Sequence, residues 1–101
     1  RESSMKSFDP PAILADRSRL LIMAALAMAA KPVDFMTLAG SLPLTKGNLS
    51  VHLRKLEQAG LISVTKEFIE RKPRTSFVCT AQGRKCIRNY LHDVETLLSK
   101  V

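Results

Sequence analysis

Cysteine and long hydrophobic runs are both scarce in this sequence. Two cysteines, Cys79 and Cys86, are too few and too close for a disulfide framework, which favours a reducing, cytoplasmic environment. The longest apolar run, Leu20 to Ala30, is too short to span a membrane and is typical of a buried helix. The first residues, Arg1–Ser7, lack the apolar segment of a secretion signal. We therefore expect one soluble domain of ordinary size.

Catalytic and metal-binding signatures are also missing. The sequence pairs no nucleophile with a base, and it has no glycine-rich phosphate loop and no carboxylate cluster. His52 and His92 are far apart, and no cysteine–histidine spacing resembles a zinc site. His52 is better interpreted as a packed or phosphate-touching helix residue than as a ligand. We expect a protein that is not an enzyme and that uses no metal or cofactor.

Positive charge, in contrast, is abundant and unevenly placed. The net charge is +7, and the stretch from Thr45 to Arg88 holds ten basic and three acidic residues, so it carries the whole excess. A contiguous basic segment is expected of a surface that meets a polyanion such as nucleic acid. A merely solubilising surface remains the alternative on composition alone.

Apolar periodicity and capping residues predict the first two helices. The first spans Ile13 to Ala30, with a break near Asp16, and its methionines, Met23 and Met28, are interpreted as core filling. The second spans Phe35 to Ser41 and follows Asp34, which is a good N-cap.

The third helix is predicted over Lys46 to Ala59, and both of its ends are marked. Thr45 is the N-cap, and Gly60 is well placed as the left-handed residue that ends a helix in a Schellman motif. Leu42 to Leu44 forms the short turn before it. Two helices joined by such a turn predict a helix-turn-helix.

A β-hairpin and a last helix complete the predicted elements. Ile62 to Phe68 and Thr75 to Cys79 are strand candidates, and Ile69 to Arg74 is interpreted as the basic loop between them. Thr80 then caps a helix of about Ala81 to Lys100, whose apolar stripe is close to a heptad seam. Residues 1–9 are expected to be a flexible extension, and residues 10–101 one domain.

This order predicts a winged helix-turn-helix, mainly α with a small β-hairpin wing (α-α-α-β-β-α), dimerised by its terminal helices. The third helix would anchor through one apolar side and read bases with the other. Asn48 and Arg54 have the donor and acceptor geometry that reads adenine or guanine, and Val51 suits a thymine methyl. The free amides after Thr45 suit a phosphate, as does Lys46.

Three segments carry a resemblance to a known group. The run GNLSVHLRKLEQAGL at Gly47 to Leu61, the wing RKPRT at Arg71 to Thr75, and TAQGR at Thr80 to Arg84 resemble compact winged-helix regulators related to the MarR and ArsR families. Pro43 stands where related turns usually have glycine, and the cysteine pair of ArsR-type metal sensors is absent. The resemblance covers Ala12 to Leu98 and implies a prokaryotic regulator that binds duplex DNA as a homodimer.

Site residues follow from the helix pattern and the resemblance together. The predicted DNA-binding residues are Thr45, Lys46, Gly47, Asn48, Ser50, Val51, Arg54, Lys55, Arg71, Lys72 and Arg74. The predicted dimer interface, from the first and last helices, is Ile13, Leu14, Ile87, Tyr90, Leu91, Val94, Leu97 and Leu98.

The sequence thus predicts a cytoplasmic, nucleoid-associated transcription regulator on a pseudo-palindromic operator, with half-sites about 10 base pairs apart or a multiple of that. One alternative is a winged helix that binds another protein. Another is a regulator that responds to an unknown small-molecule effector between the first and last helices, or to oxidation of Cys86. Basic residues near Cys86 in the sequence could lower its pKa.

Overall fold

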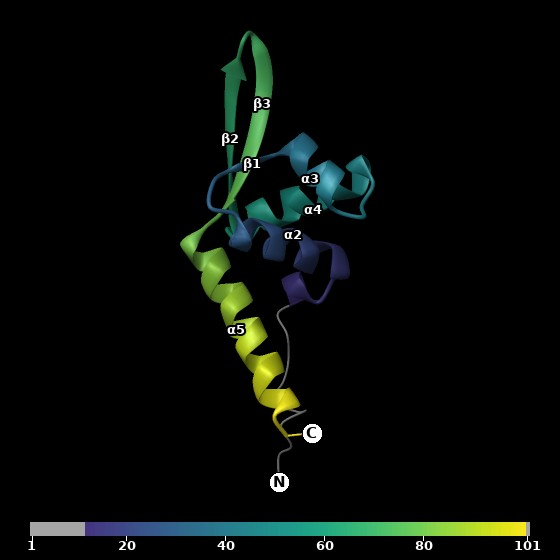
Figure 1. Cartoon of the computed structure of the whole chain (residues 1–101), viewed down its shortest axis with the longest axis vertical. Coiled ribbons are helices and arrows are strands. Elements are labelled where there is room, and N and C mark those ends of the chain that lie inside the picture. The colour runs from purple at the N-terminus through teal and green to yellow at the C-terminus, as the bar shows by residue number, and fades with distance from the viewer. Residues whose placement is uncertain (1–11, 101) are drawn as a thin grey trace.

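The computed structural model describes residues 12–100 and has the expected winged helix-turn-helix order (Figure 1). The predicted flexible extension 1–9 lies outside the described residues. No helix in the described part of the chain is long and apolar enough to cross a membrane. The elements are, in chain order, η1 (Ala12–Leu14), α2 (Arg17–Met28), β1 (Val33–Asp34), α3 (Phe35–Ser41), α4 (Lys46–Gln58), β2 (Ile62–Ile69), β3 (Lys72–Cys79) and α5 (Ala81–Leu98).

The first predicted helix is divided at Asp16, as expected. The Asp16 carboxylate accepts hydrogen bonds from the amides of Ser18 (2.8 Å) and Arg19 (3.1 Å), so it caps α2 and leaves η1 as a separate turn. The helix ends at Met28, before the predicted Ala30, and the Met28 side chain is 85% exposed. The core-filling interpretation is therefore wrong for Met28, whereas Met23 is fully buried.

One hydrophobic core joins α2, α3, α4 and the base of the sheet. Apolar side chains at helical spacing on α4 and α2 face each other there and exclude water, which is the main stabilising term of the domain. The largest fully buried side chains are Leu14, Ile22, Met23, Leu26, Leu38, Leu49, Leu56 and Ile62.

The end of α4 is a Schellman motif, as predicted, although the helix stops one residue early, at Gln58. Gly60 has a positive φ of 78°, which glycine adopts without steric cost. The Leu61 amide donates to the Leu56 carbonyl and the Gly60 amide to the Glu57 carbonyl, both at 3.0 Å. These bonds turn the chain sharply from the helix into β2.

The sheet has the order β1-β3-β2 and is antiparallel throughout. The pairing of β1 with β3, Val33 opposite Phe77 and Asp34 opposite Ser76, is absent from the sequence prediction because a two-residue strand leaves no periodic signal. It ties the start of α3 to the hairpin.

The hairpin, or wing, is longer than predicted. Strand pairing continues to Ile69 opposite Lys72, so most of the predicted loop Ile69 to Arg74 is strand and the turn is Glu70-Arg71. Both turn residues have positive φ, 54° and 68°, as in a two-residue type I′ turn. Such turns normally use asparagine and glycine, so Glu70 and Arg71 gave no sequence signal for this turn.

Helix α5 begins beside the wing base and leads away from the domain, opposite to the wing (Figure 1). Thr80 caps it by accepting from the Gly83 amide (3.0 Å), and its hydroxyl donates to the Gly60 carbonyl (2.8 Å). Arg84 donates to the Ala27 carbonyl (2.9 Å) and so satisfies the end of α2. The helix ends at Leu98, two residues before the predicted Lys100.

Candidate nucleic-acid interface

The exposed arc of α4 carries the residues predicted to read DNA. The Thr45 hydroxyl accepts from the Asn48 amide (3.1 Å) and so starts the helix at Lys46. Leu49, Leu53 and Leu56 are buried on the inner side and hold the helix against the core. The predicted α4 residues are all exposed on the other side or at the first turn: Thr45, Lys46, Gly47, Asn48, Ser50, Val51, Arg54 and Lys55.

Two flanks of this arc face different neighbours. Ser50 and Arg54 line a hollow together with Lys66 and Thr75 of the wing, so this flank faces β2 and β3. Lys55 lies on the other flank, where it lines a shallow depression with Ile13 and Arg19. Val51 lies between them and is 47% exposed, so its methyl groups are accessible to a ligand.

Lys66 is a basic residue of this surface that the sequence prediction missed. It lies on the same strand face as Ile62 and Val64, and alternation along β2 could have revealed this placement. The side chain is beyond the end of the core and is exposed. With Arg54 it places two cations on the hollow between α4 and the wing, which Glu57 also lines.

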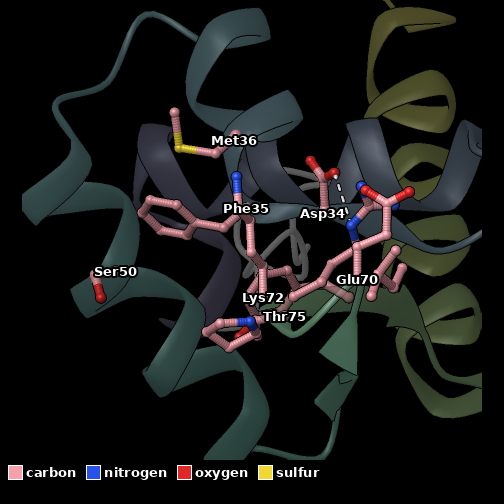
Figure 2. A pocket seen from close by; sticks show the side chains of 11 residues that line it. Asp34, Phe35, Met36, Ser50, Glu70, Lys72 and Thr75 are labelled. Atoms are coloured by element: carbon pink, nitrogen blue, oxygen red, sulfur yellow. Dashed lines mark ion pairs between the residues drawn. The ribbon is translucent and has the colours of Figure 1, made fainter. Parts of the chain in front are cut away.

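The three predicted wing cations, Arg71, Lys72 and Arg74, do not all lie in one loop. Arg71 is in the terminal turn, whereas Lys72 and Arg74 are strand residues at the edge of β3 that β1 leaves unpaired. Figure 2 shows the Lys72 side chain reaching toward Phe35 and Met36 at the start of α3. These residues line a hollow of about 650 Å³ between the wing and α3. The three cations thus form two groups, one at the tip and one beside α3.

Asp34 connects this hollow to the start of α3. Its carboxylate accepts from the Thr37 amide (2.7 Å) and lies 3.9 Å from Nε of Arg74, the ion pair drawn in Figure 2. Hydrogen bonds from the hydroxyl and amide of Thr37, assisted by the Arg74 charge, hold the pKa of Asp34 below its ordinary value. The same carboxylate therefore caps α3 and restrains the wing edge.

Asp34→Asn should make the free energy of unfolding less dependent on pH in the acid range. A carboxyl whose folded-state pKa is depressed contributes stability above its unfolded value of about 3.9, and this contribution is lost as pH falls through the folded value. Asparagine keeps the cap but cannot titrate. The difference in unfolding free energy between the two proteins should therefore be constant above pH of about 5 and shrink below about 4. Urea titrations across this range test it, with Asp93→Asn as the control; parallel curves to the lowest pH would contradict it.

His52 lies on α4 between two charged residues of the first helical region. Its Nδ1 is 3.3 Å from Nη1 of Arg19 and its Nε2 is 3.9 Å from the Asp16 carboxylate. The Arg19 amide, more than the His52 charge, holds the pKa of Asp16 below its ordinary value. Among residues 12–100 no three histidine, cysteine or acidic side chains converge on a possible metal position. His52 thus packs as a helix residue that joins α4 to the start of α2.

Burial, not nearby positive charge, governs the cysteines. Cys79 is buried in the core, as the strand pattern predicted, and burial raises the pKa of both the Cys79 and the Cys86 thiols. The expectation that basic neighbours lower the Cys86 pKa is therefore wrong. Because the thiolate is the reactive form, a raised pKa does not favour the redox alternative.

Two of the predicted dimer residues are buried within the single chain. Leu14 and Ile87 belong to the core, at 1% and 5% exposure, so their side chains are not available to contact a second subunit. Leu91 and Leu98 on α5 are 57% and 64% exposed. Ile13, Tyr90, Val94 and Leu97 are half-buried.

The fold and this surface define a class of protein, and sequence comparison names it. The chain belongs to the winged helix DNA-binding domain family, whose model matches residues 18–98. This family is defined by DNA binding and not by catalysis, in agreement with the expectation that the protein is not an enzyme.

Individual relatives and solved structures are similar to this chain. An uncharacterised protein of Methanocaldococcus jannaschii is 34% identical over 68 residues, which is 67% of this chain and 74% of that protein. A transcriptional regulator homologue of Pyrococcus horikoshii has a TM-score of 0.85 and 30% identity over 96% of this chain and 95% of its own. MepR of Staphylococcus aureus, solved in complex with DNA, has the same fold, with a TM-score of 0.70, 17% identity, and coverage of 96% and 74%. The fold is also that of ArsR-family regulators, while the specific motifs stay a prediction.

Proposed function

We propose that this protein is a transcription regulator that binds duplex DNA sequence-specifically, as a homodimer on a pseudo-palindromic operator. The observation that carries the proposal is the exposed arc of α4. Small, polar and basic side chains cover it, while the opposite side is anchored in the core. A helix anchored in this way and flanked by a basic wing fits a major groove. A protein of the same fold, MepR, has been solved in complex with DNA, which supports DNA as the ligand.

The roles of individual residues follow from their positions on that surface. Asn48, Val51 and Arg54 would meet base edges, because they project from the exposed arc. Lys46, near the free amides of the first turn, would hold a phosphate, and the cations of the wing would follow the backbone. Arg74 would contact a phosphate through its outer nitrogens while Asp34 orients its Nε.

Helix α5 supports the homodimer part of the proposal. Its second half extends beyond the domain at the end opposite to the wing (Figure 1). Leu91 and Leu98 are exposed there and lie on one side of the helix. An extended helix with an exposed apolar stripe is unfavourable in water and is typical of a helix that packs on a partner. Two copies related by a two-fold axis would present two α4 helices to half-sites about 10 base pairs apart, or a multiple of that.

Substitution at Arg54 and Lys72 separates reading of bases from attraction to phosphate. Duplexes selected from a random library supply the operator for binding titrations. Arg54→Ala should relax the preference at one position by about tenfold, since one bidentate base contact provides 1–3 kcal/mol of discrimination. Lys72→Ala should weaken all duplexes alike and reduce the salt slope by about one.

The control is Lys100→Ala, which removes the same charge at the opposite end of the molecule and should leave binding almost unchanged. An Arg54→Ala protein with unaltered affinity and unaltered preference would overturn the groove assignment. A wild-type protein that is monomeric and has no affinity for any duplex would overturn the whole proposal and favour a winged helix that binds another protein.

A further inference from the structure

One face of the wing becomes apolar again beyond the end of the core. Residues that alternate along a strand lie on one face, so Val64 opposite Phe77, Lys66 opposite Thr75 and Phe68 opposite Pro73 follow each other along it. Burial decreases in that direction: Phe77 is buried, whereas Phe68 is 78% exposed and Pro73 is exposed too. The outermost pair is therefore a bulky apolar pair without a covering element among the described residues.

This face of the wing is the one that faces the recognition helix. Lys66 and Thr75 line a hollow with Ser50 and Arg54, and Pro73 lines the adjoining hollow with Ser50. A duplex seated on the exposed arc of α4 would therefore lie on the same side as the Phe68–Pro73 pair. The pair faces the proposed ligand and does not face away from it.

Positive charge surrounds the apolar pair. Lys66 is the next residue inward on the same face, and Arg71 and Lys72 follow within the turn and the opposite strand, all three exposed. The exposed acids Glu67 and Glu70 lie among these cations, so the charge around the pair is positive in balance and not uniformly positive. The Glu70-Arg71 turn is only two residues long, so the tip is narrow and short. An aromatic ring on a tip whose charge is positive in balance complements a ligand that is anionic outside and apolar inside, which describes the phosphates and stacked bases of a duplex.

We propose that Phe68 and Pro73 form an apolar wedge, which the wing inserts into the minor groove beside each half-site and which partly unstacks one base step. This inference rests on the proposed function and extends it to a base step that the protein would recognise by its deformability and not by hydrogen bonds. Phenylalanine and proline are among the side chains that kink DNA in this way. The preferred step is a deformable pyrimidine–purine step, TA or CA, because unstacking such a step requires least energy.

The experiment compares Phe68→Ala with wild type on library-selected duplexes that carry 2-aminopurine at successive flanking steps. With wild-type protein, fluorescence should rise at one step, and replacing that step by an A-tract should weaken binding by about tenfold. Phe68→Ala should lose both effects but keep the base preference that depends on Arg54. Phe68→Leu, which retains an apolar side chain, should keep part of each.

Thr65→Ala is the matched control, since Thr65 is exposed on the other face of the same strand; it should behave as wild type. Thermal unfolding of each variant verifies the fold, which loss of a largely exposed ring should leave intact. If Phe68→Ala keeps both the fluorescence change and the step preference, the wedge is wrong while base reading by α4 stands. If wild-type protein binds no duplex, the proposed function itself fails, and the wedge fails with it.

Discussion

Replacing Gly83 by alanine should lower the free energy of unfolding by about 2–3 kcal/mol, as an overpacked core position does. A Cβ at this position would overlap the carbonyl oxygen of Leu61 and lie 3.0 Å from the Cys79 sulfur. The Leu61 carbonyl cannot move aside easily, because it accepts the Thr80 amide at 3.1 Å. Helix α5 would have to move away from the end of α4 to make room.

The sign of this effect distinguishes packing from helix propensity. Alanine is normally better than glycine inside a helix by about 1 kcal/mol. Gly40→Ala in α3 is the control, since a Cβ there meets nothing within 4 Å, and it should stabilise the protein slightly. Urea unfolding of the two variants tests the prediction. A Gly83→Ala protein as stable as wild type would show that α5 does not approach Leu61 this closely.

Replacing Leu91 and Leu98 together by glutamate should convert the proposed dimer to a monomer and weaken operator binding at least 100-fold. Both leucines are exposed on α5 and are seven residues apart, so they share one side of the helix. Burying a leucine contributes about 1.5–3 kcal/mol, and placing a carboxylate in the interface adds a desolvation penalty. Losing the second subunit also removes the avidity of two linked half-sites, commonly a factor of about 10² to 10⁴.

Sedimentation and operator titration of the same samples measure the two effects. Asn89→Glu with Thr96→Glu is the matched control, because these exposed positions have the same spacing and receive the same charge off the leucine stripe. It should remain dimeric and bind with nearly wild-type affinity. A wild-type protein that sediments as a monomer at micromolar concentration would refute the α5 interface, and a monomer that keeps full affinity would refute the two-half-site arrangement.

Local chemistry explains why so much of the helical structure could be predicted. Asp34, Thr45 and Thr80 each cap the helix that follows them, and each acts within three residues of its own position. Gly60 ends α4 in the same local way. Because capping and periodicity depend on neighbours along the chain, α4 and its exposed arc could be located from residues 45–60 alone.

Contacts between distant segments decided the rest. Val33 and Asp34 form a strand only because β3 lies beside them, and Arg84 caps α2 across a separation of 57 residues. The extent of the wing, its turn with two positive φ values and the place of Lys72 and Arg74 beside α3 all depend on strand pairing. None of these leaves a periodic or compositional signal in its own segment.

The amino-acid order alone was therefore sufficient to predict the winged helix-turn-helix class, the starts of α3, α4 and α5, and the side of α4 that faces solvent. These features follow from short-range capping and from the spacing of apolar residues. Tertiary structure alone decided that Leu14 and Ile87 are core residues. It also decided that Phe68 is exposed on the face of the wing directed toward α4, and that a side chain at Gly83 would meet the Leu61 carbonyl. Those features depend on close packing between segments far apart in the chain, where a single methyl group or one strand pair changes the outcome.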